Sequence, residues 1–193
     1  MRIAVIDENA ARAAIIEQGL AEVGEREVFI ISERKGMVQA IAKIEPDVVL
    51  VDLGNPSRDM LEEYFAVSRA VAKPVAMFVD QSDEDSIAAA VDAGVSAYIV
   101  DGMSQNRLKP ILDLAVRRFN AFSHLQTELQ QARDALADRS IIDKAKLILV
   151  EKRGMTEPEA HKLLRNHAMN NNKRITEIAE AIVTADQLMG DMK

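Results

Sequence analysis

The sequence has no cysteine, no tryptophan and no long uninterrupted run of apolar residues. Without cysteine the chain can form neither disulfides nor zinc sites with thiolate ligands. No apolar run approaches the roughly 20 residues that a helix needs to span a bilayer, and the N-terminal stretch leads into a strand pattern rather than a signal peptide. A hydrophobic content of 48% is too high for a disordered chain. The sequence therefore predicts a folded, cytoplasmic protein with no membrane partner.

Motifs for catalysis are lacking as well. There is no glycine-rich phosphate loop and no Ser/His/Asp arrangement, and the three histidines are not spaced as metal ligands. His167 falls on the apolar side of a predicted helix and is expected in the core, whereas His161 is expected at the surface. Met155 and Met169 have the character of side chains that fill gaps in a core. An enzyme is not expected, and a binding function is favoured.

The charge of the chain is unevenly distributed. The whole sequence carries 24 Lys and Arg against 31 Asp and Glu, but the segment from Lys144 to Arg174 carries eight basic residues against three glutamates. A basic patch on an acidic protein is the electrostatic footprint of a site for a polyanion. Charge alone equally allows a solvated helix face of mixed sign, so this alternative stays open.

Residues 1–103 alternate between strand and helix patterns. Short apolar runs, buried on both faces and each followed by a helical segment, predict an α/β domain with a flavodoxin-like parallel sheet of five strands. The predicted strands are Ile3–Ile6, Val28–Ile31, Val48–Val51, Val75–Val79 and Ala97–Val100, and the predicted helices are Ala10–Glu22, Gly36–Ile44, Arg58–Val71 and Asp83–Ala93.

Acidic residues follow two of these strands. Asp7 and Glu8 end the first strand, and Asp52 ends the third. In a parallel sheet, binding sites form beyond the carboxyl ends of the strands. Three carboxylates at that edge would repel one another unless a proton or a divalent cation were present, and oxygen ligands of this kind suit Mg²⁺. The sequence thus predicts an acid cluster able to hold Mg²⁺, although no cofactor is required.

From Gln105 the pattern is that of one long helix that runs to about Arg139, a linker over residues 104–139. Apolar residues recur every seven positions, which predicts the a/d seam of a coiled coil, interrupted by arginines at two d positions. The first part is expected to pack as the last helix of the α/β domain. The seam beyond it favours a weak or conditional homodimer, and the alternative is a helix that lies back on its own protein. The seam residues are Phe122, Leu125, Leu129, Ala132 and Leu136.

The last part of the chain, residues 140–193, is all-α in its pattern. The first helix is predicted at Ser140–Arg153. The second begins after Thr156, a capping residue, and ends at the asparagine run 170–172, because asparagine accepts left-handed turns. The third carries an apolar face from Ile175 onwards. Three such helices bury a common core, but a small one.

Several positions in this module follow a known pattern: Ala145-Lys146, Gly154, Glu159-Ala160, Leu163-Leu164-Arg165, Ala168-Met169, Arg174 and Ile178-Ala179. They resemble the ANTAR domain, the RNA-binding module of bacterial transcription antiterminators of the AmiR/NasR type. Leu147 departs from the pattern, because the family usually has glycine there. The resemblance implies that residues 140–193 bind hairpins of a leader RNA and so prevent a terminator from forming. The expected contacts to phosphates and loop bases are Lys144, Lys146, Lys152, Arg153, Arg165, Lys173 and Arg174.

The acid cluster resembles that of the receiver domain of two-component response regulators. In that family an acid pair, here Asp7 and Glu8, binds Mg²⁺, and the aspartate after the third strand, here Asp52, accepts phosphate. The resemblance implies a receiver-like domain over residues 1–120.

Two positions depart from the receiver pattern. Val79 stands where the family has a hydroxyl residue, and Asp101, followed by Gly102, stands where it has a lysine. Valine donates no hydrogen bond, and Asp101 would add negative charge beside a phosphoryl group. We therefore expect a pseudo-receiver that is controlled by a protein partner.

Residues 55–102 closely resemble the nitrate-responsive NasT branch of the AmiR/NasR family. In that branch a nitrate- or nitrite-binding partner of the NasS type holds the regulator inactive, and the resemblance implies the same partner and signal here. Two other functions stay open: a phosphorylation-controlled response regulator that binds DNA, and an adaptor whose basic face docks on an acidic protein. DNA is the weaker alternative, because the second helix of the module begins Thr-Glu-Pro-Glu, whose carboxylates repel phosphates.

Overall fold

The computed structural model describes residues 1–101 and 105–190. The chain divides into two compact units, Met1–His124 and the residues from Leu125 onwards, and each has its own hydrophobic core. Gly102 and the predicted start of the linker at residue 104 lie outside the described residues. Within those two ranges, no helix is both long enough and apolar enough to cross a membrane.

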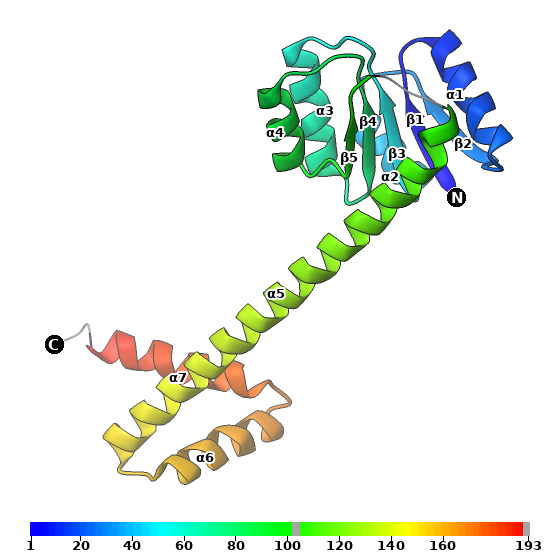
Figure 1. Cartoon of the computed structure of the whole chain (residues 1–193). Coiled ribbons are helices and arrows are strands. Elements are labelled where there is room, and N and C mark those ends of the chain that lie inside the picture. Colours follow the sequence, from blue (N-terminus) through cyan, green and yellow to red (C-terminus); the bar gives the residue numbers. More distant parts are fainter. Residues whose placement is uncertain (102–104, 191–193) are drawn as a thin grey trace. The chain divides into compact units, whose positions relative to one another are not determined.

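The first unit is built on a parallel sheet with the strand order β2-β1-β3-β4-β5 (Figure 1). This confirms the predicted flavodoxin-like sheet of five strands. Because the order reverses between β1 and β3, the carboxyl ends of these two strands flank the place where sites form in such folds. The strands are β1 (Arg2–Ile6), β2 (Glu27–Ile31), β3 (Val48–Asp52), β4 (Val75–Phe78) and β5 (Ala97–Ile99).

Only the three inner strands are buried on both faces. All residues of β3 and β4 are buried, and so is β1 from Ile3 onwards, whereas β2 and β5 form the partly exposed edges of the sheet. The prediction that all five strands are buried on both faces is therefore wrong for β2 and β5. An edge strand lacks one neighbour and is less covered, and an apolar run does not reveal which strand lies at the edge.

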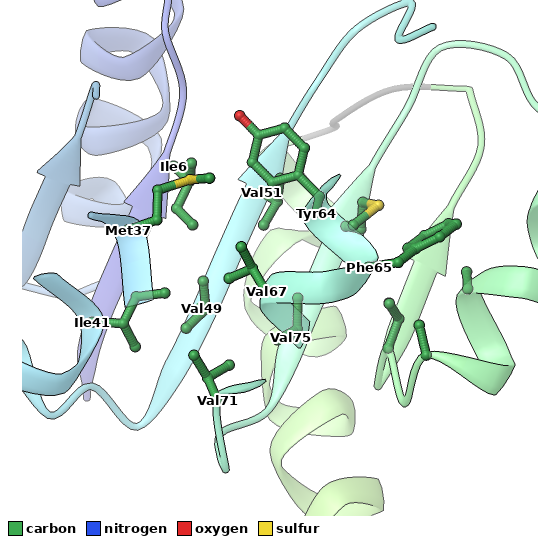
Figure 2. Close-up of a cluster of buried hydrophobic side chains, with 14 of the residues drawn as sticks. Ile6, Met37, Ile41, Val49, Val51, Tyr64, Phe65, Val67, Val71 and Val75 are labelled. Carbon is green, nitrogen blue, oxygen red and sulfur yellow. The ribbon is translucent and has the colours of Figure 1, made fainter. Parts of the chain in front are cut away.

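Helices cover both faces of the sheet. Ala4 and Ile6 of β1 point into the core beneath α2, α3 and α4, part of which Figure 2 shows. Ile3 and Val5 point into the second core, beneath α1 and the start of α5. The helices are α1 (Ala10–Glu22), α2 (Met37–Ile44), α3 (Arg58–Ala70) and α4 (Glu84–Asp92). They agree with the predicted helices to within a residue at each end.

The first part of α5 belongs to this unit. Leu108, Leu112 and Ala115 are buried against the sheet, which confirms that this segment packs as the last helix of the α/β domain. The ammonium nitrogen of Lys109 lies 2.5 Å from a carboxylate oxygen of Glu25, a buried residue, and so ties the helix to the loop before β2.

The prediction that a separate helix begins at Ser140 is wrong. α5 runs as one helix from Gln105 to Arg153. No glycine or proline occurs between Pro110 and Gly154, so nothing in the backbone chemistry interrupts the helix. Gly154 then adopts a φ of 63°, a left-handed conformation that ends the helix as expected.

The predicted coiled-coil seam is exposed along α5. The side chains of Phe122, Leu129 and Leu136 are 61%, 52% and 68% exposed, and Leu125 and Ala132 are exposed as well. At these positions the seam is not covered by the unit to which each residue belongs. The seam remains available for a partner, and the dimer itself stays a prediction.

The second unit is a module of three helices: the end of α5, α6 (Glu157–Asn170) and α7 (Ile175–Gly190). At the start of α6 the carboxylate of Glu159 accepts hydrogen bonds from the backbone N–H and the hydroxyl of Thr156, at 2.9 and 2.8 Å. After α6 the chain turns through Asn172, whose φ is 52°. The core is small, as predicted, and consists of Ala145, Leu149, Ala160, Leu164 and Ala179, with partly buried apolar neighbours.

Two residues that were predicted in this core lie at the surface. His167 is exposed and Met169 is 70% exposed, whereas Met155 packs against the core and His161 is exposed, both as predicted. In α6 the buried residues are spaced four apart, at positions 160, 164 and 168. A helix in so small a module buries only this narrow stripe, and the side chains that flank it reach solvent.

Candidate functional site

The first candidate site lies beyond the carboxyl ends of β1 and β3, and Asp7 is its most buried acid. The guanidinium of Arg12 donates two hydrogen bonds to this carboxylate, from Nε to Oδ2 at 3.1 Å and from Nη2 to Oδ1 at 2.8 Å. The backbone N–H of Asn9 donates to Oδ1 at 2.8 Å. A bidentate pair with a further hydrogen bond is the kind of contact that offsets the burial of a charge.

Glu8 is held by different partners. Arg34 binds its carboxylate through Nε and Nη2, and the Tyr64 hydroxyl donates to it at 3.4 Å. The hydrogen bond from Arg34 lowers the pKa of Glu8, and burial raises the pKa of Tyr64 to about 12. Across residues 1–101 and 105–190, no group of three or more His, Cys, Asp or Glu is placed to hold a metal ion. Separate guanidinium groups hold Asp7 and Glu8, and a Mg²⁺ site formed by Asp7, Glu8 and Asp52 stays a prediction.

Asp52 is the predicted phosphoacceptor and is only 8% exposed. Burial raises its pKa above the usual value for aspartate, and the nearby negative charges of Asp7 and Asp80 raise it further. The positive charge of Arg12 and the backbone N–H of Gly54 oppose the rise. Asp52 is thus more difficult to ionise than an exposed aspartate.

The two positions that depart from the receiver pattern carry side chains without hydrogen-bond donors. Val79 is fully buried, and its backbone N–H donates to the carbonyl of Ile99 at 2.9 Å. Asp101 is exposed, with a φ of 74°. These positions supply neither a hydroxyl nor an ammonium group to the neighbourhood of Asp52.

We expect Asp52→Asn to raise the thermal stability of the protein at neutral pH. Because the folded-state pKa of Asp52 is raised, folding favours the protonated carboxyl. The contribution of this carboxyl to stability is complete below the ordinary pKa of aspartate, and it is lost as the pH rises through the folded-state pKa. Asparagine cannot ionise and removes this loss. Melting temperatures of the two proteins at pH 7 and near pH 4 measure the effect, which should be larger at pH 7. Asp113→Asn on the exposed side of α5 is the control, and an equal change in both variants would contradict the prediction.

The second candidate site is the basic surface of the three-helix module. Two of the seven predicted RNA contacts have acidic partners within the protein. Lys146 lies 2.6 Å from Asp143 and 2.7 Å from Glu157, and its side chain is only 15% exposed. Lys152 pairs with Asp186. Lys146 therefore fastens α5 to the start of α6, which is a structural role that the sequence did not reveal.

The other five predicted contacts lie at the surface. Each is exposed, and within the part of the chain that the structure describes none has an acidic side chain at salt-bridge distance. These residues are Lys144, Arg153, Arg165, Lys173 and Arg174. We call them the free cations of the module.

An open groove of about 480 Å³ lies between α5, α6 and α7. Its walls include apolar side chains from all three helices, among them Ile148, Leu163 and Ile178. Lys152, Arg153 and His167 line it as well. Sequence reasoning missed His167 as a site residue, because helical spacing placed it on the apolar face, and only the packing shows that this face borders a groove.

Residues 130–183 match the ANTAR domain. Over 88% of its length the chain is 30% identical to the transcriptional regulatory protein PdtaR of Mycobacterium tuberculosis, and it covers 85% of that protein. The chain belongs to the family of ANTAR-domain regulators. The resemblance seen in the sequence is confirmed, and the ANTAR match begins within α5, ahead of Ser140.

The chain is also similar to another regulatory protein and, in fold alone, to two solved structures. The Nitrate regulatory protein of Klebsiella oxytoca is 29% identical over 94% of the chain, which corresponds to 40% of that protein. A pilus assembly-related protein of Burkholderia pseudomallei has a TM-score of 0.53 at 18% identity, over 61% of this chain and 90% of that one. The signal receiver domain of a diguanylate cyclase from Desulfovibrio desulfuricans has a TM-score of 0.50 at 15% identity, over 62% of this chain and 95% of that one. These two structures support the receiver fold alone.

Proposed function

We propose that this ANTAR regulator is a transcription antiterminator that binds hairpins of a leader RNA. The observation that carries the proposal is the set of free cations, five exposed basic side chains without acidic partners on one small module. RNA phosphates can pair with these side chains without first displacing a carboxylate. Hairpin loops are the expected target, because the deep and narrow major groove of an RNA duplex excludes side chains.

The groove between α5, α6 and α7 is the proposed place for an unstacked loop base. The module has no Phe, Tyr or Trp, so it lacks the aromatic platforms on which many RNA readers stack bases. Apolar side chains such as Ile148 and Leu163 offer a surface for the face of a base, and Arg153, one of the free cations, can pair with an adjoining phosphate.

The active form is proposed to be a homodimer joined along the exposed seam of α5. The apolar side chains of Phe122, Leu129 and Leu136 support this step, because contiguous exposed apolar surface of this kind marks interaction sites. Pairing of two chains presents two ANTAR modules. Two hairpins of one transcript can then bind together, which raises the overall affinity without any new interaction.

The proposed signal is nitrate or nitrite, sensed by an inhibitory partner of the NasS type. The similarity to a relative named Nitrate regulatory protein supports this signal. A pseudo-receiver fits such control, because Val79 and Asp101 leave Asp52 without the usual donors. Inhibition requires that the partner binds one state of the regulator more tightly than the other, and the ligand must weaken that preference.

The decisive experiment is binding of the purified chain to its own operon's leader RNA and to matched duplex DNA over a range of salt concentrations. We expect hairpin-dependent RNA binding whose affinity falls steeply with salt. The double variant Lys173→Ala/Arg174→Ala should bind RNA roughly 10- to 100-fold more weakly. Its salt slope, the slope of log affinity against log salt concentration, should be smaller by about one for each phosphate that the variant no longer neutralises. Addition of the partner should abolish RNA binding only when nitrate is absent.

Two controls separate RNA binding from general effects of charge and folding. Lys35→Ala/Lys43→Ala removes the same charge from the exposed surface of the first unit and should leave RNA affinity unchanged. Lys146→Ala should lower the stability of the module and leave the salt slope as it is, because Lys146 already has two acidic partners. A preference for duplex DNA would replace the proposal by a DNA-binding response regulator. A dimer that binds neither nucleic acid would favour the adaptor.

A further inference from the structure

The position of Arg12 in the first turn of α1 is unusual for a cation. The N-terminus of a helix carries partial positive charge, and a basic side chain there is disfavoured. The local sequence nevertheless fixes the residue in place, because the Asn9 side chain caps α1 by accepting hydrogen bonds from the backbone N–H groups of Ala11 and Arg12, at 3.0 and 3.3 Å. From this capped first turn, the guanidinium of Arg12 binds the carboxylate of Asp7, which lies five residues earlier in the chain.

Three hydrogen bonds occupy most of the roughly four acceptor sites of the Asp7 carboxylate. Oδ2 accepts from Nε, and Oδ1 accepts from both Nη2 and the backbone N–H of Asn9. A divalent cation such as Mg²⁺ needs free oxygen lone pairs in near-octahedral geometry, at about 2.0–2.1 Å. Arg12 therefore competes directly with a divalent cation for the oxygens of Asp7.

The remaining nitrogen of Arg12 reaches the loop after β3. A Cβ built on Gly54 would lie 2.7 Å from Nη1 of Arg12 and 3.5 Å from Oδ2 of Asp80. Gly54 also has a φ of 60°, so both the close approach and the backbone conformation favour glycine there. The hydrogen bonds that Arg12 donates to Asp7 raise the pKa of Arg12 most, and the negative charges of Asp7, Asp52 and Asp80 raise it further.

We propose that Arg12 is a built-in cation of the acid cluster at Asp7, Asp52 and Asp80, where it takes the place of a divalent metal ion and competes with it for Asp7. The guanidinium joins the β1–α1 loop, through Asp7, to the loop after β3, next to Gly54. Millimolar divalent cation should consequently leave the stability of the receiver unit unchanged. This inference does not depend on RNA binding.

The test measures Mn²⁺ binding to the full chain from the electron paramagnetic resonance signal of the free ion. Mn²⁺ prefers the same oxygen ligands and octahedral geometry as Mg²⁺. Wild type is compared with Arg12→Ala, with Arg12→Gln, and with the double variant Arg12→Ala/Asp7→Asn. Glutamine removes the charge but keeps an N–H donor for Asp7, which helps the fold to persist. Arg26→Ala, an exposed residue of the same unit, is the charge-matched control.

We expect wild type and Arg26→Ala to show no saturable Mn²⁺ binding at low millimolar concentrations. Arg12→Ala and Arg12→Gln should bind Mn²⁺ at least roughly tenfold more tightly than wild type, because a full positive charge has left the acid cluster. They should also gain thermal stability on addition of Mn²⁺. The added Asp7→Asn change should abolish both effects. Saturable binding by wild type that Asp7→Asn removes would overturn the proposal, and so would a folded Arg12→Gln with no gain in affinity.

Discussion

Leu129→Ala/Leu136→Ala should make the protein monomeric and lower its affinity for a leader RNA with two hairpins by roughly 100- to 10,000-fold. The two leucines are the central and last large side chains of the exposed seam. Arginines at two other seam positions already weaken the coiled coil, so the removal of two leucine side chains should suffice. Analytical ultracentrifugation gives the oligomeric state, and titration of the same samples with RNA gives the affinity.

A matched control separates the seam from the helix itself. Gln131→Ala lies on α5 between the two leucines but off the seam, and it should change neither the dimer nor the affinity. For an RNA with a single hairpin, the leucine variant should bind as wild type does, because only one module is engaged at a time. A monomeric variant that retained full affinity for the two-hairpin RNA would show that the dimer plays no part in RNA binding.

The parts of the fold that sequence predicted well are those set by local patterns. Apolar runs and helical periodicity located every strand and every helix of the first unit, because burial of these runs is the main reason that the elements form. The asparagine run ended α6 for a similarly local reason. The break predicted at Ser140 was avoidable, since the sequence contains no glycine or proline there to interrupt α5.

The features that sequence reasoning missed are set by interactions between distant residues. Glu8 lies beside Asp7 in the chain, but Arg34 and Tyr64, which follow other strands, decide where its carboxylate is held. Arg12 is a partial exception, because its place in the first turn of a helix that follows two acids was readable from the sequence. The guanidinium is nevertheless recognised as an alternative to a metal ion only once its two hydrogen bonds to one buried carboxylate are seen.

The same distinction applies to the basic module. Its excess of positive charge was visible in the sequence, but not which cations have partners. Lys146 belongs to the ANTAR pattern and was predicted to contact RNA, yet it is nearly buried between two acids. Counting charges therefore did not separate Lys146 and Lys152, which have acidic partners, from the five free cations, and contacts with RNA stay a prediction for all seven.

Leu164→Ala is expected to unfold the ANTAR module while the receiver unit stays folded. Leu164 is fully buried and is one of only two large aliphatic side chains among the five buried residues of that core. Removal of a buried leucine side chain costs about 2–5 kcal/mol. A unit of about sixty residues has a free energy of unfolding on the order of 3–9 kcal/mol, so this one change removes much or all of it. RNA binding at 37 °C should disappear with the fold.

Hydrogen exchange on the full chain distinguishes this outcome from global unfolding. Backbone amides of α6 and α7 should lose protection, whereas those of β1 and β3 should retain it, because the two units have separate cores. Met169→Ala on the same helix is the control, since that side chain is 70% exposed and should change stability by only about 0.5 kcal/mol or less. If both variants lost protection equally, α6 would not be held by the core stripe at positions 160, 164 and 168. If Leu164→Ala also exposed β1 and β3, the two units would be coupled in folding, and a partner that binds the receiver unit could then act on the RNA-binding module through its stability.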